Sequence, residues 1–196
     1  MNKSLKKYSD EKRVWTINGM GFNPGSFNVP KDYKYDTYFT YRNSSHGWGS
    51  WSDRWNKAIL DTSILKNEIS EIINQLNFNK GGADLTPMLV NQIEGNIDSW
   101  SVRWGYTISK NNGICISPIY SYVTLIFDEG THVKGYVGFL DNNLDLSKSI
   151  TTYPEEIEVV VEIAREAAKV FKDKTPLLLE KNINQKSYYR KYLKRK

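Results

Sequence analysis

The stretch from Asp98 to His132 constrains the fold of this chain more than any other part of the sequence. Its first half reads D-S-W-S-V-R-W-G-Y-T-I-S-K-N-N-G, an aromatic-rich segment that predicts a helix beginning at Asp98. The pair Asn112-Gly113 ends that helix, because glycine is favoured just past a helix C-terminus. The apolar run 114–118 then predicts a strand. This order leaves Asp98 and His132 at the ends of elements, where polar side chains can face a cleft.

The rest of the chain mixes strand and helix patterns, which predicts an α/β fold with a mixed sheet and flanking helices. Further strands are expected at 13–18, 35–41 and about 122–127. Helices are expected after Ser52 or Asp53, over Leu65–Leu76, over Thr86–Ile93 and from a capping box at Thr152–Glu155. We expect one main unit over residues 1–150, followed by an amphipathic helix and a basic, Tyr-rich tail over 151–196.

Composition narrows the class of protein. With 39% hydrophobic residues, global disorder is not expected. The six Trp and thirteen Tyr either fill the core or line sugar and base sites, since their rings offer an apolar face and a polar tip. A single cysteine, Cys115, excludes an internal disulfide and any Cys-rich metal site. The sequence has no signal-peptide pattern and no apolar run of ~20 residues. We therefore expect a cytoplasmic protein.

Both ends of the chain are basic, within a net charge of +5. Such ends either attract lipid headgroups, phosphates or nucleic acid, or are simply solvated. Contact with the inner face of the membrane is therefore one expectation. Specific nucleic-acid binding is not expected from so short a tail, although tyrosines are interleaved with its cations Lys186, Arg190, Lys191, Lys194, Arg195 and Lys196.

The candidate chemistry rests on carboxylates and one histidine. The sequence has no nucleophile elbow, no phosphate-binding Walker loop and no dinucleotide glycine fingerprint. Asp98 either caps a helix N-terminus or acts as a general base, and the same two roles fit Asp84 after Gly81-Gly82. His132 is either a turn residue or a ligand to a divalent metal.

Several motifs, in this order, resemble the C-terminal half of family 2-like glycosyltransferases with the GT-A fold. They are Y-F-T-Y-R-N-S-S-H-G-W-G-S-W-S-D-R-W (Tyr38–Trp55), G-G-A-D-L-T-P-M-L (Gly81–Leu89), I-D-S-W-S-V-R-W (Ile97–Trp104), G-I-C-I-S-P (Gly113–Pro118) and G-T-H (Gly130–His132). The resemblance implies a partial GT-A domain, similar to nucleotide-diphospho-sugar transferases. It also implies transfer of a sugar from a nucleotide-sugar donor to a glycan or lipid-linked acceptor.

The resemblance also implies roles for individual residues. Asp98 is the first choice for the general base, one residue from the family's usual register, and Asp84 is the second. His132 matches a histidine that helps hold the Mn²⁺ or Mg²⁺ ion at the donor diphosphate. The acceptor side is expected to involve Trp48, Trp51, Arg54, Trp55, Trp100, Arg103 and, as support, Trp104.

The family's N-terminal half is not matched. That half carries a β-α-β nucleotide-binding unit and a DxD metal motif ahead of the matching region. We therefore expect weak or no activity from these residues alone, with the donor half lost or supplied by another polypeptide or by self-association. One alternative is a non-catalytic module that binds carbohydrate or protein. A second is nucleic-acid or anionic-membrane binding through the basic C-terminus.

Overall fold

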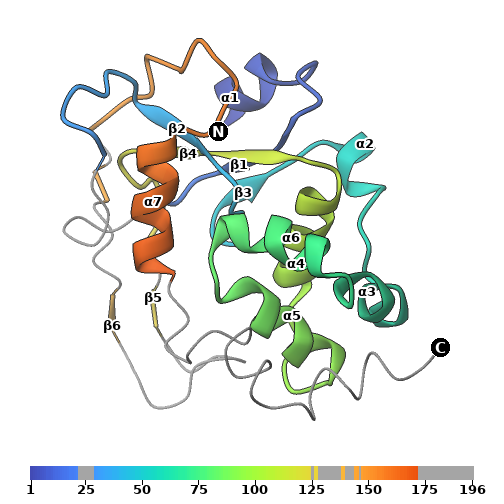
Figure 1. The fold of residues 1–196 in the computed structure, drawn as a ribbon. Coiled ribbons are helices and arrows are strands. Elements are labelled where there is room, and N and C mark those ends of the chain that lie inside the picture. The colour runs from blue at the N-terminus through green and yellow to red at the C-terminus, as the bar shows by residue number, and fades with distance from the viewer. Residues whose placement is uncertain (22–28, 125, 128–137, 140–143, 146, 172–196) are drawn as a thin grey trace.

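The computed structural model describes residues 1–21, 29–124, 126–127, 138–139, 144–145 and 147–171 (Figure 1). Its centre is a four-stranded mixed sheet in the order β2-β4-β1-β3. The strands are β1 (Val14–Asn18), β2 (Thr37–Thr40), β3 (Trp48–Gly49) and β4 (Ile114–Pro118). A separate two-stranded ladder joins β5 (Ile126–Phe127) to β6 (Gly138–Phe139). The α/β class with a mixed sheet and flanking helices is therefore confirmed.

Helices account for most of the remaining regular structure. They are α1 (Asn2–Lys7), α2 (Ser52–Trp55), α3 (Thr62–Ile69), α4 (Ile72–Phe78), the 3-10 helix η1 (Asn79–Gly81), α5 (Leu85–Ile93), α6 (Trp100–Lys110) and α7 (Val161–Val170). Figure 1 shows α3 to α6 gathered at one side of the sheet, with α7 beside β2. No helix in the described ranges is long and apolar enough to cross a membrane.

The central strands β1 and β4 run parallel, and the edge strands β2 and β3 run antiparallel to their neighbours. All five residues of β1 are buried, as are all five of β4, because helices or loops cover both faces of the sheet. A β-bulge in β1 shifts the register between Val14 and Thr16. Bulges redirect side chains, and here both Trp15 and Thr16 contact Trp104 of α6.

Two clusters of apolar side chains cover the opposite faces of the sheet. Trp15, Trp104, Ile108 and Cys115 pack together between the sheet and α6. The other face buries Val14, Ile17, Phe39, Ile114 and Ile116, with Tyr8 beside them and Tyr153, Ile157 and Val159 packed against them. Residues 153–159 thus share the core of residues 1–150, and α7 buries Ile163 and Ala167 against Tyr38.

The helix predicted over Leu65–Leu76 is wrong in its extent. The chain forms two helices instead, because Glu71 adopts an extended conformation between them (φ −78°, ψ 123°). Leu65 and Ile69 are buried, but the interruption rotates the following residues away from the core. As a result, Ile72, Ile73 and Leu76 of α4 are 50–60% exposed.

Three predicted helix starts also differ from the structure. Asp98 lies outside α6, whose N-cap is Ser99, with its hydroxyl accepting from the Val102 amide at 3.3 Å. Neither Ser52 nor Asp53 caps α2, which begins after Trp51 without a side-chain cap. No helix begins at Thr152, because the Thr151 and Thr152 amides and hydroxyls donate to the Asp36 carboxylate instead. Helix α7 starts only at Val161.

The other predicted elements are close to those observed. The strands at 13–18, 35–41 and 114–118 correspond to β1, β2 and β4, and the helix at Thr86–Ile93 corresponds to α5. Of the strand predicted at about 122–127, the described residues include the two residues of β5. The basic tail from 172 lies outside the described residues.

Candidate functional site

Three tryptophans from three different elements form an aromatic surface that we call the tryptophan platform: Trp48, Trp55 and Trp100. Trp48 lies in β3, Trp55 ends α2 and Trp100 begins α6. The ring centroids are 5.0 Å apart for Trp48 and Trp100, 5.7 Å for Trp48 and Trp55, and 6.1 Å for Trp55 and Trp100. Trp55 and Trp100 are each 37% exposed, so the platform presents ring surface to solvent.

A buried tryptophan, Trp104, packs against two rings of the platform. Trp104 lies one helical turn after Trp100 and is fully buried. Its ring is 5.0 Å from that of Trp55 and 6.3 Å from that of Trp48, and its indole N–H donates to the Thr16 hydroxyl at 3.0 Å. Because this indole is fixed to β1, the rings above it rest on the sheet rather than on a loop.

The platform lies beside β3, the edge strand of the sheet. Trp48 of β3 pairs in register with Asn18, the last residue of β1. Helix α2, which ends in Trp55, lies beside the segment that precedes β1, because Asp53 pairs with Lys12 at 3.1 Å and Arg54 donates to the Glu11 carbonyl oxygen at 3.0 Å. The platform therefore spans the β3 edge of the sheet rather than one end of its strands.

Asp98 and Arg103 form an ion pair at the start of α6, the helix whose first residue is Trp100. The Arg103 guanidinium donates to Asp98 Oδ1 at 3.3 Å, and Arg103 is itself held by the Ser99 and Leu60 carbonyl oxygens. The Asp98 side chain is 90% exposed, whereas that of Arg103 is 19% exposed. Within the described residues, Asp98 Oδ2 accepts no hydrogen bond. One carboxylate oxygen is thus oriented by Arg103 while the other faces solvent.

Trp51 and Arg54, both expected on the acceptor side, form a separate structural contact. The Arg54 guanidinium stacks on the Trp51 ring at 4.1 Å and donates to the Ser9 and Glu11 carbonyl oxygens at 3.0 Å each. The Trp51 indole donates to the Leu5 carbonyl oxygen at 3.2 Å. Since Arg54 is only 3% exposed, we assign this pair to anchoring the N-terminal segment against α2.

Asp84, the second candidate base, lies in a different part of the molecule. Its two carboxylate oxygens each accept from Arg42 at 2.8 Å, and the Arg42 guanidinium stacks on the Phe171 ring at 3.7 Å. Gly82 (φ +139°) passes so close that a Cβ there would lie 2.6–2.7 Å from Asp84, Arg42 and Phe171. Both oxygens of Asp84 are therefore engaged in joining the 79–84 turn to β2 and α7.

The remaining candidates concern metal and thiol chemistry. His132 lies outside the described residues, and those that are described contain no cluster of three or more His, Cys, Asp or Glu side chains able to hold a metal ion. Cys115 is fully buried in the sheet, and burial raises the pKa of its thiol to about 12. A thiol held in this state is not a nucleophile.

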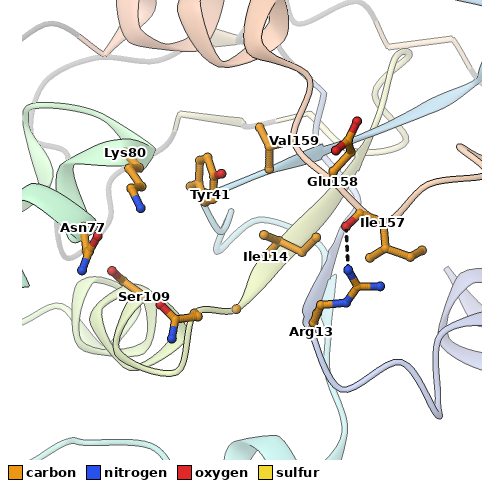
Figure 2. A pocket seen from close by; sticks show the side chains of 11 residues that line it. Arg13, Tyr41, Asn77, Lys80, Ser109, Ile114, Ile157, Glu158 and Val159 are labelled. Atoms are coloured by element: carbon orange, nitrogen blue, oxygen red, sulfur yellow. Dashed lines mark hydrogen bonds between the residues drawn. The ribbon is translucent and has the colours of Figure 1, made fainter.

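A hollow lies at the C-terminal end of α6, the end opposite to Trp100, and contains none of the predicted site residues (Figure 2). It has a volume of about 340 Å³ and is bounded by the ends of α4 and α6, the start of β4 and residues 157–159. Because these segments are far apart in sequence, no local pattern singled the hollow out.

Comparison of the chain with protein-family models, with curated proteins and with solved structures found no match. The candidate site is therefore defined by its own geometry. That geometry brings Trp48, Trp55 and Trp100 together and pairs Asp98 with Arg103 at the start of the helix that carries Trp100. It engages Trp51, Arg54 and Asp84 in separate structural contacts.

Proposed function

We propose that this chain is the acceptor-binding and base-bearing part of a GT-A glycosyltransferase, and that the tryptophan platform binds the acceptor glycan. The observation that carries the proposal is the group of partly exposed indole rings that forms the platform, with the exposed Asp98 carboxylate two residues before Trp100 in the chain. Aromatic faces suit the apolar C–H face of a sugar ring, and a carboxylate at their rim suits its hydroxyl groups.

The proposed reaction is an inverting transfer. The acceptor hydroxyl oxygen attacks the anomeric carbon of the donor sugar, the bond to the nucleoside diphosphate breaks, and Asp98 takes the hydroxyl proton. Asp98 Oδ2 is the atom available for this step, because Oδ1 accepts from Arg103. Arg103 acts as a positioning residue: its bonds to two backbone carbonyl oxygens fix the carboxylate relative to the platform.

Asp98 is favoured over Asp84 as the base because of their surroundings. Both oxygens of Asp84 are bound by one guanidinium, and its side chain is 26% exposed. Asp98 keeps one free oxygen and reaches solvent. We therefore propose Asp98 as the base and a structural role for Asp84.

The donor side is not part of this site. The resemblance covers only the acceptor-side half of the family. We therefore expect the nucleotide-binding residues in another part of the protein or on a partner polypeptide. No step is assigned to the implied Mn²⁺ or Mg²⁺ ion, since the described residues form no carboxylate or histidine cluster for it. We propose a cytoplasmic location, with peripheral contact to the inner membrane face where lipid-linked acceptors reside.

Glycan binding by platform variants tests the proposal. We expect saturable binding of an oligosaccharide from a panel built of glucose, galactose and N-acetylglucosamine. Removing a stacking ring in Trp100→Ala or Trp55→Ala should weaken it about tenfold, or about 1.4 kcal/mol. Tyr35→Ala is the matched control, because Tyr35 is a partly exposed aromatic residue beside β2, at the opposite edge of the sheet from β3. Equal losses in all three variants would contradict the proposal.

A second candidate function is glycan binding without catalysis. It is favoured by the engagement of Asp84 and Arg54 in structural contacts, which leaves Asp98 as the one predicted base with an oxygen open to solvent among the described residues. Asp98→Asn separates the two functions in a sugar-transfer assay reconstituted with a donor-binding polypeptide. Loss of transfer with retained glycan binding supports the enzyme, and unchanged transfer supports the binding module.

A further inference from the structure

We propose that the hollow at the C-terminal end of α6 is a second binding site, and that it takes a neutral sugar ring. We define the hollow by its polar lining, Tyr41, Asn77, Lys80, Ser109, Asn112 and Glu158. These residues come from five places: the end of β2, the end of α4, η1, the end of α6 and the segment before α7. Figure 2 shows the labelled ones around the hollow. Its volume of about 340 Å³ is at the small end of the range for ligand pockets.

The polar groups of the hollow are not used elsewhere. In the described part of the chain, the side chains of Asn77, Ser109 and Asn112 make no hydrogen bond, and those of Tyr41 and Glu158 make none either. Lys80 forms no ion pair there, and its ammonium group lies 5.8 Å from the centre of the Tyr41 ring. These donors and acceptors therefore remain available to a ligand.

The frame around these groups is held in place. Arg13, at one wall, donates to both carboxylate oxygens of Glu11 at 2.9 Å and to the Ile157 carbonyl oxygen at 3.2 Å, which ties residue 157 to the start of β1. Ile114, 7% exposed, and Val159 give the hollow an apolar side. A fixed frame with an apolar side and a few convergent polar groups is the usual form of a small-ligand site.

The balance of charge selects the class of ligand. Besides Arg13, the lining contains one cation, Lys80, and one anion, Glu158, together with two side-chain amides and two hydroxyls. Arg13 is already neutralised by Glu11. A phosphate would require more unpaired cations or backbone amides. A ring that carries several neutral hydroxyl groups matches this mixture of donors, acceptors and one aromatic side chain.

The hollow is separate from the tryptophan platform. Asn112 follows the last turn of α6 and Trp100 begins its first turn, so the 11-residue helix separates them by about 16 Å at a rise of about 1.5 Å per residue. The hollow also lies at the amino ends of β1 and β4, next to Arg13 and Ile114. The inference therefore stands without the proposed glycosyltransferase function.

Nuclear magnetic resonance titration of the ¹⁵N-labelled full chain tests this site and the platform separately. The probes are glucose, galactose and N-acetylglucosamine, with inorganic phosphate as the anionic comparison. We expect the side-chain amides of Asn77 and Asn112 and the backbone amide of Gly113 to shift saturably with at least one sugar. The indole N–H signals of Trp48, Trp55 and Trp100 report the platform independently.

Asn77→Ala should weaken the sugar binding seen at Gly113 about fivefold, the loss of one neutral hydrogen bond. Asn67→Ala, an exposed amide on α3, is the matched control and should leave it unchanged. Three results overturn the inference: no sugar shifts these amides, phosphate binds more tightly than every sugar, or Asn67→Ala weakens binding as much as Asn77→Ala.

Discussion

The contrast between Asp84 and Asp98 yields the sharpest prediction about this chain. Asp84→Asn removes one charge from a bidentate pair in which Arg42 is 17% exposed and Asp84 is 26% exposed. In this variant the mostly buried Arg42 guanidinium, stacked on Phe171, faces one neutral amide oxygen of Asn in place of the two carboxylate oxygens of Asp84. Hydrogen bonds to charged groups contribute about 1.5–3 kcal/mol each, so we expect a loss of about 2–3 kcal/mol in the free energy of unfolding. Asp98→Asn changes a single 3.3 Å bond on a side chain that is 90% exposed, and it should leave stability nearly unchanged.

The assay is thermal unfolding of both variants followed by circular dichroism, with urea unfolding for the free energy. A loss of about 2–3 kcal/mol corresponds to a fall in Tm of roughly 4–12 °C for a chain of this size. Arg42→Met combined with Asp84→Asn should cost less than the sum of the two single changes, because the variants share one interaction. Equal stability of Asp84→Asn and Asp98→Asn would refute the structural role of Asp84.

Three further predictions concern the core. Arg54→Met should cost about 2–4 kcal/mol in urea unfolding, because the Ser9 and Glu11 carbonyl oxygens lose their buried donor; an unchanged midpoint would contradict the anchoring role. Gly113→Ala should cost about 1–3 kcal/mol, since a Cβ there would lie 2.4 Å from Cδ1 of Trp15, and a wild-type Tm would contradict that packing. The pKa of Cys115 is raised to about 12 by burial, whereas an unfolded thiol ionises near ~8.5. Above about pH 8.5 the thiol therefore loses its proton only in the unfolded state, so the free energy of unfolding should fall as the pH rises. A Cys115→Ala variant should lose this pH dependence.

The elements that the sequence predicts well are those bounded by strong local signals. Gly113 and Pro118 bracket β4, and Pro87 lies in the first turn of α5. The division between α3 and α4 has no such signal, because Ser70 and Glu71 are ordinary helix residues and only the packing of Leu65 and Ile69 sets the phase.

The platform is only partly predictable, for a related reason. Aromatic enrichment marks Trp48, Trp55 and Trp100, but it marks Trp51 equally. The side chain of Trp51 is covered because α1 brings the Leu5 carbonyl oxygen to its indole, and Arg54, held by the Ser9 and Glu11 carbonyl oxygens, stacks on its ring. Such contacts join segments far apart in the sequence, and no local pattern encodes them. The hollow at the end of α6 has the same origin.

Contact between a glycan and particular tryptophans is the central prediction for this chain. The six indole N–H signals of the labelled chain can be followed during titration with an acceptor oligosaccharide. We predict saturable shifts at Trp48, Trp55 and Trp100, and none at Trp15 or Trp51, whose rings are packed against other side chains. Indole signals that stay unchanged with every oligosaccharide, or shifts led by Trp51, would contradict the proposed acceptor site.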